Sequence, residues 1–410
     1  MPEFLRLLPP DQAMTLVLGH LLSRPVPETV ALSQALGRVT VKPIVAPHPL
    51  PAFTRSSVDG YAVRAVDTFG ASESLPVYLP VNGEVLMGTA PAFRLDAAGC
   101  ALIHTGGMLP LGADAVVMVE NTQLARPGEV EVFRAVAVGV NVIGVGEDVT
   151  AGQEVISKGT RLRPAEIGGL AALGIIQVEV TRRPRVGILS SGDEVIPPER
   201  NPQPGQVRDV NTYTLAALVE QSGGSSVLIG IIPDVVESLW RAVQKALEDC
   251  DMVVITAGSS ASSRDLTAQV INQSGQPGVL VHGVNVRPGK PTILGVCDGR
   301  AVIGLPGNPV SALVIAGLFI TPLIDNFMGV ALPRSHPSVP ARLTVNLPSQ
   351  AGREDWVPVH LIPGPQGYQA DPLFGKSNLI FTLVRADGLV RIPPDATGLE
   401  AGAWVEVWFL

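Results

Sequence analysis

The sequence is poor in the residues that stabilise small secreted proteins or bind polyanions. Only three cysteines occur among 410 residues, Cys100, Cys250 and Cys297, and none forms a CxxC pair. A disulfide framework and a zinc site are therefore not expected, and we predict three core cysteines. Lysine and arginine number 29 against 37 acidic residues, a formal net charge of -8. This balance argues against nucleic acid or an anionic membrane as a partner, because both attract basic surfaces.

Aromatic and charged residues are also scarce, at 4% and 16%, whereas hydrophobic residues make up 46%. This composition excludes a disordered chain and suits buried sheets flanked by helices. The longest apolar run, Val310 to Ile324, is interrupted by polar residues and a proline, so it predicts a buried helix rather than a membrane span. The first six residues contain an acid and a proline where a signal peptide would be apolar, which favours a cytoplasmic location.

Several chemical signatures are absent as well. No Walker-type lysine loop occurs, and no G-x-G-x-x-G follows a predicted strand, so P-loop ATP hydrolysis and NAD chemistry are not indicated. The six histidines show no metal-ligand spacing, and we assign them no role.

The first 180 residues predict a β domain inserted into a helix-and-strand element. Thr15 to Arg38 has a helical pattern, and Val39 to Val45 follows as a strand. Residues 50–149 consist of short β-rich runs separated by glycine and proline turns, which is typical of a compact β domain. A helix over Pro164 to Leu173 and a strand over Ile176 to Val180 complete the interrupted element.

From Arg185 onward, apolar strands alternate with helices, which predicts a parallel sheet covered on both faces. An Asp298-Gly299 turn predicts a hairpin between the last two strands. After residue 333 the chain returns to short strands, so a terminal β domain is expected. The predicted strands are Val186 to Leu189, Val227 to Ile231, Met252 to Ile255, Leu280 to Val286, Thr292 to Cys297 and Ala301 to Ile303, with helices starting near Asn211, Val235, Asp265 and Pro309.

Ligands of open α/β sheets bind at the carboxyl ends of the strands, where this sequence has loops over residues 190–194, 233–234, 257–264, 287–291 and 305–309. Every loop contains a glycine or a proline. Such an edge can hold both anions and a divalent metal ion, because it gathers carboxylates and cations: Asp193, Glu194, Asp234, Asp265, Arg264, Arg287 and Lys290.

Two of these loops indicate oxyanion binding. Asn308 is placed as an N-cap with Pro309 in the first helical turn, and free amides there favour an oxyanion. A merely well-capped helix explains the same residues equally well. Two prolines and a glycine fix the turn that carries Lys290, although a solvated surface lysine is the alternative.

The carboxylates also allow two interpretations each. Asp193 and Glu194 could bind Mg²⁺ or act in acid/base chemistry, or they could be a helix cap and its surface neighbour. Asp59 lies in a Ser-Ser-Val-Asp-Gly-Tyr segment of the β domain, which could be a catalytic site or an ordinary Asp-Gly turn.

Together these segments resemble the molybdopterin molybdenumtransferase family, the bacterial MoeA type that also forms the C-terminal domain of gephyrin. The resemblance covers nearly the whole chain. The matching segments, in the family's order, are Ala35 to Arg38, Ser57 to Val63, Thr105 to Pro110, Gly112 to Val117, Gly146 to Asp148, Ser191 to Glu194, Pro288 to Pro291 and Leu305 to Ser311.

The resemblance implies four domains. They are an elongated linker domain over 1–48 and 147–181, an inserted β domain over 49–146, a three-layer α/β molybdopterin-binding domain over 182–330 and a C-terminal β barrel-like domain over 331–410. It also implies a homodimer in which Asp59 and Thr105 of one subunit face the sheet edge of the other, and contact with a molybdopterin adenylyltransferase.

The family reaction takes adenylylated molybdopterin and molybdate, cleaves the adenylate with Mg²⁺, and releases molybdenum-molybdopterin and AMP. The resemblance therefore implies a catalytic set of Asp59, Glu194, Asp234, Asp265 and Lys290, and magnesium ligands among Glu194, Asp234, Asp265 and Asp148. It implies substrate-binding roles for Thr105, Ser191, Gly192, Asp193, Gly258, Arg264, Arg287, Pro288, Gly289, Pro306, Gly307, Asn308 and Pro309.

The chain departs from the family pattern in places. The loop from Gly258 to Asp265 is rich in serine and one residue shorter, Arg287 stands where lysine is common, and Ile143 where arginine is common. A molybdopterin adenylyltransferase would lack the inserted and C-terminal β domains. A scaffold that binds the pterin without catalysis is the second alternative.

Overall fold

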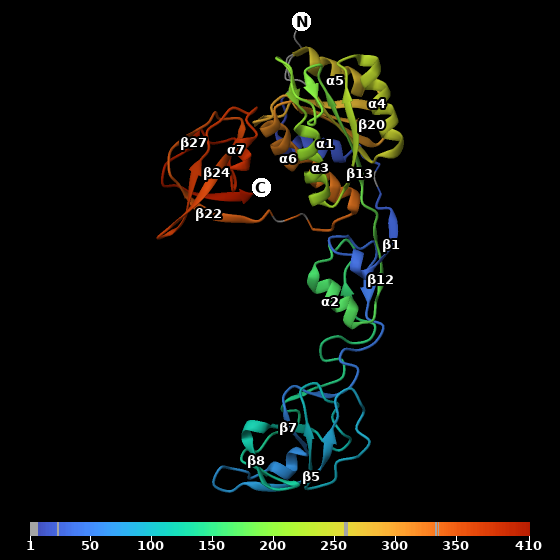
Figure 1. The fold of residues 1–410 in the computed structure, drawn as a ribbon, viewed down its shortest axis with the longest axis vertical. Helices are drawn as coiled ribbons and strands as arrows, with labels where there is room; N and C mark the ends of the chain where they lie inside the picture. Colours follow the sequence, from blue (N-terminus) through green and yellow to red (C-terminus); the bar gives the residue numbers. More distant parts are fainter. Residues whose placement is uncertain (1–6, 23, 258–260, 333, 335) are drawn as a thin grey trace.

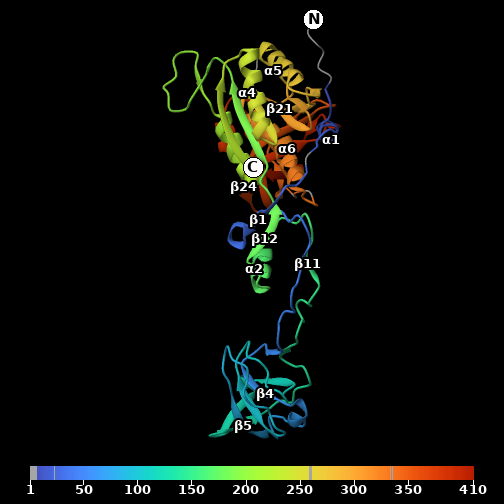
Figure 2. The same cartoon turned by 90° about the vertical axis from the view of Figure 1, so that its right-hand side faces the viewer.

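The computed structural model describes residues 7–22, 24–257, 261–332, 334 and 336–410, with only the backbone described for 261–264. The molecule is elongated. The α/β domain and the C-terminal barrel lie together at one end, the inserted β domain lies at the other, and the linker domain connects them (Figures 1 and 2).

The linker domain is built on strand β1 (Pro27–Ala31), which pairs antiparallel with β12 (Gln177–Thr181). The predicted helical segment Thr15 to Arg38 is wrong. Helix α1 (Pro10–Leu18) ends early, and the following prolines prevent its continuation, so residues 27–31 form β1 and only the 3-10 turn η1 (Leu32–Gln34) follows.

Two further linker predictions differ in outcome. The predicted helix over residues 164–173 is confirmed as α2 (Pro164–Ala172). The predicted strand over residues 39–45 is reduced to β2 (Ile44–Val45), which pairs with β11 (Glu154–Ile156), and to isolated bridges at Val39 and Thr40.

The inserted domain is a six-stranded sheet of order β7-β4-β6-β5-β9-β8. The pairing of β4 with β7 is close, because a Cβ at Gly60 would lie 1.9 Å from the Val117 carbonyl oxygen. The strands are β4 (Gly60–Val63), β5 (Val77–Val85), β6 (Cys100–Ile103), β7 (Ala115–Met118), β8 (Thr122–Arg126) and β9 (Glu129–Val132), with β3 (Arg55–Ser56) and β10 (Val142–Ile143) paired beside them, and 3-10 turns η2 (Ala65–Thr68) and η3 (Val119–Asn121).

The α/β domain has the predicted three layers, with a sheet of order β16-β13-β17-β21-β20-β18. Only β20 runs against the other five strands. Helices α3 and α6 pack on one face of the sheet and α4 and α5 on the other. The elements are β13 (Arg185–Ser191), α3 (Asn211–Ser222), β16 (Ser225–Ile232), α4 (Val236–Asp249), β17 (Met252–Ala257), α5 (Ala261–Gln273), β18 (Pro277–His282), β20 (Ile293–Cys297), β21 (Arg300–Pro306) and α6 (Pro309–Met328), with the small pair β14 (Val195–Ile196) and β15 (Val207–Arg208).

A hairpin, a strand and a helix of the α/β domain can be compared with their predicted bounds. The Asp298-Gly299 hairpin is confirmed, since both residues have positive φ, 50° and 83°. The single strand from Leu280 to Val286 is wrong, because β18 ends at His282 and the separate β19 (Val286–Arg287) joins the C-terminal sheet. Helix α5 begins at Ala261, four residues before its predicted start.

Helix α6 is the central helix of this domain. Among the described residues it alone is long and apolar enough to span a membrane, but 67% of its most apolar window is buried inside the protein. It therefore forms the buried helix that the apolar run predicted.

The C-terminal domain is a closed barrel. Its sheet has the order β19-β24-β25-β22-β28-β26, and a pairing of β24 with β26 closes the ring. The strands are β22 (Ser338–Leu343), β24 (Glu354–Gly364), β25 (Gly367–Pro372), β26 (Gly388–Ile392) and β28 (Trp404–Phe409), accompanied by the pair β23 (Leu347–Pro348) and β27 (Gly398–Leu399) and by helix α7 (Phe381–Val384).

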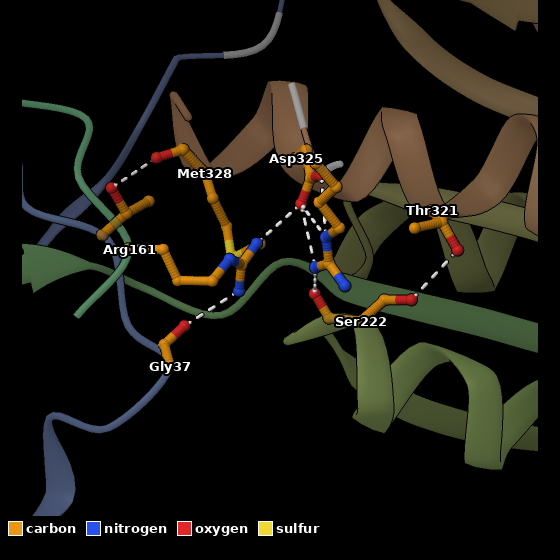
Figure 3. Close-up of polar contacts among 8 residues, drawn as sticks. Gly37, Arg161, Ser222, Thr321, Asp325 and Met328 are labelled. Atoms are coloured by element: carbon orange, nitrogen blue, oxygen red, sulfur yellow. Dashed lines mark hydrogen bonds and ion pairs between the residues drawn. The ribbon is translucent and has the colours of Figure 1, made fainter. Parts of the chain in front are cut away.

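A charged cluster joins three of these domains at the end of α6 (Figure 3). The carboxylate of Asp325 accepts hydrogen bonds from Arg161 of the linker at 2.6 Å and from Arg334, which leads to the barrel, at 2.9 Å. Arg161 also donates to the Gly37 carbonyl at 2.9 Å. One carboxylate, with its side chain only 12% exposed, thus holds two guanidinium groups from different parts of the chain.

Candidate functional site

The carboxyl ends of β13 and β16 bring together part of the predicted acidic set. The Ser191 hydroxyl donates to the Asp234 carboxylate, and the Asp234 amide lies 3.4 Å from the Asp193 carboxylate. The φ of Gly192 is 151°, and a Cβ there would lie 2.9 Å from Glu194 Oε2. The bend at Gly192 therefore brings these acidic side chains to one edge of the sheet.

A chain of buried hydroxyl groups lies beneath this edge. Asp209 accepts the Thr212 amide at 3.1 Å and the Thr212 hydroxyl at 2.6 Å. Ser190 Oγ lies 3.0 Å from Thr212 Oγ1 and 2.9 Å from Thr256 Oγ1. Because an ionised carboxylate only accepts, each hydroxyl donates toward Asp209. The chain fixes the start of α3 against the ends of β13 and β17, a support that no spacing in the sequence indicated.

The remaining predicted acids are more scattered. Asp265 is exposed within α5, while Gly258 lies outside the described residues and the side chain of Arg264 is not described. The Asp148 amide donates to the Leu50 carbonyl, which places Asp148 where the linker meets the inserted domain. In the described part of the chain, no group of three or more histidine, cysteine or acidic residues is arranged to hold a metal ion.

The turn that carries Lys290 is pressed against α6. Gly289 has φ 114°, and a Cβ there would lie 2.2 Å from Ile315 Cγ1. The Thr292 hydroxyl donates to the Gly289 carbonyl at 2.7 Å. Only glycine fits this position, so the backbone beside the exposed Lys290 is fixed, as the two prolines of the turn predicted.

This turn lines a cavity of about 660 Å³ between the α/β domain and the barrel. Asp355, with its side chain 4% exposed, accepts hydrogen bonds from Arg353 at 2.6 Å and 3.0 Å and lies 3.7 Å from Arg287. Lys290 and Lys376 form no ion pair with a described residue. Four cationic side chains thus line the cavity against one acidic side chain: Arg287, Lys290, Arg353 and Lys376.

The start of α6 forms another wall. Asn308 is the N-cap residue as predicted, but its side chain donates to Ser377 Oγ at 3.1 Å instead of capping the helix. The Val310 amide donates to the Ser377 carbonyl at 3.0 Å. The first amide of α6 is thus occupied by the barrel, and an oxyanion in this cavity would depend mainly on side chains. Pro306 also lines the cavity, and the Gly307 carbonyl accepts from Asn211 at 2.9 Å.

The second cluster lies on the inserted domain. The Asp59 carboxylate accepts the Thr105 amide at 2.7 Å and the Thr105 hydroxyl at 3.2 Å. These bonds, the amide first, lower the pKa of Asp59, and His104 at 3.7 Å adds to the effect. Asp59 is therefore an exposed acid whose hydrogen bonds favour its ionised form, which fits either a catalytic acid or an Asp-Gly turn. Strand β4, which follows it, lies at the far end of the molecule from β24 and α6 (Figures 1 and 2).

Some residues of these clusters were not predicted. Arg353, Lys376 and Ser377 belong to the barrel, and no local spacing links them to Lys290. His104 was set aside because it has no metal spacing, yet it lies 3.7 Å from Asp59 and 3.4 Å from Glu84. Only the tertiary structure reveals these neighbours.

Comparison with known families covers most of the chain. The MoeA N-terminal region (domain I and II) matches residues 8–174, the probable molybdopterin binding domain matches residues 187–326, and the MoeA C-terminal region (domain IV) matches residues 340–410. The three matches follow the order of the linker and inserted domains, the α/β domain and the barrel.

Individual relatives extend over almost the full length. A putative molybdopterin biosynthesis protein of Methanocaldococcus jannaschii is 35% identical over 93% of this chain and 92% of its own length. Molybdopterin molybdenumtransferase 2 of Mycobacterium tuberculosis is 35% identical over 94% of this chain and 95% of its own. The crystal structure of a molybdopterin biosynthesis MoeA protein from Pyrococcus horikoshii OT3 covers 98% of this chain and 100% of its own, with a TM-score of 0.85 at 32% identity. The chain belongs to the MoeA family of molybdopterin molybdenumtransferases.

Proposed function

We propose that this protein inserts molybdate into adenylylated molybdopterin, giving molybdenum-molybdopterin and AMP in molybdenum cofactor biosynthesis. The names of its relatives support a transferase of this kind. The observation that carries the proposal for this chain is the cationic cavity beside the Lys290 turn, in a protein whose net charge is -8. Such a local cluster attracts an anionic substrate that the rest of the protein surface repels.

Molybdate is a tetrahedral dianion, and the cavity offers it charge-assisted hydrogen bonds. The ammonium groups of Lys290 and Lys376 pair with no described residue, whereas Arg353 is engaged by Asp355 and Arg287 lies near the same carboxylate. The two lysines are therefore the primary oxyanion ligands in this proposal. The pterin and the adenylate would lie along the neighbouring loops, with substrate-binding residues Ser191, Gly192, Asp193, Pro288, Gly289, Pro306, Gly307, Asn308 and Pro309. Arg264 of α5 and Gly258, which lies outside the described residues, complete this proposed set.

Carboxylates at the sheet edge supply the oxygen donors that Mg²⁺ prefers. When bound, Mg²⁺ would neutralise the pyrophosphate charge and favour its cleavage. Glu194 is exposed at this edge, Asp265 is exposed within α5, which follows β17, and Asp234 has one oxygen engaged by Ser191. We propose these three as metal ligands, and Asp148 as a fourth from a partner subunit, because its place in the linker keeps it off this edge within one chain.

The separation of the two clusters supports a homodimer. Asp59 and Thr105 are exposed, and strand β4, which follows Asp59, lies at the far end of the molecule from β24 and α6, whose residues line the cavity (Figure 2). A second subunit is therefore needed to bring the two residues to a substrate bound there. We also propose the domain boundaries given above, a cytoplasmic location and contact with a molybdopterin adenylyltransferase that hands over the adenylylated pterin.

The decisive experiment measures AMP release from adenylylated molybdopterin with molybdate and limiting Mg²⁺. The parent should release AMP, while Glu194→Gln and Asp265→Asn should slow release at least about tenfold and leave pterin affinity nearly unchanged. Glu248→Gln, an exposed acid on α4, is the matched control. Release at the parent rate by both variants would show that these carboxylates are surface acids. Pterin binding without AMP release by the parent would favour the scaffold alternative.

A further inference from the structure

A second pocket, of about 200 Å³, lies at the opposite edge of the α/β sheet. Asp251 and Arg300 line it at the amino ends of β17 and β21, where the register pairs Met252 with Ala301. Its other walls are the two chain passages between the linker and the α/β domain, one leading into β1 and one leading out of β12. None of the residues proposed for the transferase reaction lines this pocket.

The two carboxylates of this pocket are already engaged. Asp251 accepts two hydrogen bonds from Arg182 at 2.8 Å and 2.9 Å, and a third from the Arg185 amide at 2.7 Å. Asp298 accepts the Gln276 amide at 3.0 Å. Both oxygens of Asp251 are therefore engaged, whereas Asp298 accepts a single backbone amide on one of its two carboxylate oxygens.

Two guanidinium groups of the pocket have no partner among the described residues. Arg24 and Arg300 line the pocket, and neither side chain forms a hydrogen bond or ion pair with a described residue. With Arg182, three positive charges meet two carboxylates in one small space, so one positive charge is in excess and favours an anion. Both free arginines are exposed, so an ion from solution can reach them.

Backbone hydrogen bonds fix three residues near these arginines: Leu22, Val26 and Gly299. The Leu22 amide donates to the Gly299 carbonyl at 3.0 Å, and a Cβ on Gly299 would lie 2.6 Å from Leu22. The Arg182 amide donates to the Val26 carbonyl at 2.7 Å. Leu22 and Val26 thus have fixed backbone partners two residues from Arg24, and Arg300 directly follows the hairpin glycine. A tethered backbone lowers the entropic cost of ordering a ligand.

We propose that this pocket binds a small tetrahedral oxyanion such as inorganic phosphate, sulfate or molybdate. Guanidinium groups match the geometry of such anions with paired hydrogen bonds. The volume falls below the roughly 300 Å³ at which cofactor pockets begin, so a free ion fits better than a nucleotide. The bound ion would tie both chain passages to the β20–β21 hairpin and so stiffen the junction between linker and α/β domain. This inference does not depend on the proposed transferase activity.

Calorimetric titration of the full chain with inorganic phosphate tests the site. A Lys290→Ala background weakens binding in the cationic cavity and isolates this pocket. Saturable binding is expected there, and Arg24→Ala or Arg300→Ala should each weaken it by about tenfold or more, as for the loss of a charge-assisted hydrogen bond. Arg134→Ala, an exposed arginine of the inserted domain, should change nothing.

A parallel titration with AMP separates the sources of phosphate. AMP affinity should not respond to Arg300→Ala, because the pocket is too small for the nucleoside. Three results would each overturn the proposal. The first is the absence of saturable phosphate binding in the Lys290→Ala background, and the second is a phosphate affinity that neither arginine variant changes in that background. The third is a loss of AMP binding in Arg300→Ala.

Discussion

Lys290 combines a fixed backbone with a free charge. The adjacent Gly289 is wedged against α6, yet the ammonium group pairs with no described residue. We expect Lys290→Ala to weaken molybdate binding at least about tenfold, since a charge-assisted hydrogen bond is lost, while the melting temperature stays close to the parent value because the side chain is exposed. Calorimetry with molybdate and a thermal melt measure the two effects. Unchanged molybdate affinity would remove Lys290 from the site.

Thr105 sets the ionisation of Asp59 in two ways, of which the amide is the stronger. Thr105→Val removes the hydroxyl but keeps the amide, so the pKa of Asp59 should rise part of the way toward its ordinary value. Because the pKa of Asp59 is lowered in the folded protein, these hydrogen bonds stabilise the folded state fully when the pH is above the ordinary pKa of an aspartate. This stabilisation is lost as the pH falls through the lowered pKa of the folded protein. Carbon-detected NMR titration of the Asp59 carboxyl in the parent and in the Thr105→Val variant measures the shift. An unmoved Asp59 titration would contradict the assigned cause.

The sequence predicted residues of the site only where a local motif carries them. Lys290 and Asn308 stand in Pro/Gly turns that follow strands, and both line the cavity. Arg353 and Ser377 come from the barrel, far later in the chain, and meet Lys290 only through the packing of two domains. The hydrogen-bond partner of the Asn308 side chain could not be predicted either, since this side chain donates to Ser377 instead of capping its own helix. Tertiary partners overrode the local preference of an N-cap.

At the scale of elements, the central strands β13, β17 and β21 of the α/β sheet were predicted well, because each is a continuous apolar run that is almost wholly buried. The linker was predicted less well. Residues 27–31 have no such run, and their strand exists because β12 offers a pairing edge about 150 residues later in the chain. The same reason explains β19, a two-residue strand defined only by its partner β24.

The cluster at the end of α6 makes a sharp prediction about element packing. Asp325→Asn leaves Arg161 and Arg334 near each other without a counter-charge, and the pKa of Arg161 is already lowered by burial first and by Arg334 second. We expect a loss of about 3 kcal/mol in the free energy of unfolding, as when one partner of a largely buried ion pair is removed. Denaturant unfolding measures it.

The matched control for this cluster removes all three charges together. Asp325→Leu combined with Arg161→Met and Arg334→Met leaves no uncompensated guanidinium group, so this triple variant should be more stable than Asp325→Asn alone. A loss of less than about 1 kcal/mol in Asp325→Asn would instead show that the network is energetically silent.

At the scale of the whole molecule, the proposed composite site predicts complementation between inactive subunits. Asp59→Asn and Lys290→Ala each damage both sites of a homodimer. A mixed dimer keeps one intact site, formed by Asp59 of one subunit and Lys290 of the other. After random exchange of equal amounts, about a quarter of the parent AMP-releasing activity should return. Each variant alone, taken through the same exchange, is the control, and no recovery despite exchange would place both residues in one subunit's site or outside any site.

The connection of the inserted domain has a consequence for protein engineering. The chain enters and leaves that domain at neighbouring points, because the Ala46 amide donates to the Gln153 carbonyl and the Gly152 amide donates to the Ala46 carbonyl, both at 2.9 Å. The inserted domain should therefore be separable from the rest of the chain. A short glycine turn should be able to replace residues 47–152, and both the shortened chain and the excised segment should fold independently. Thermal melts followed by circular dichroism should show a cooperative unfolding transition for each of the two polypeptides. A shortened chain that fails to fold would show that the inserted domain also stabilises the linker domain.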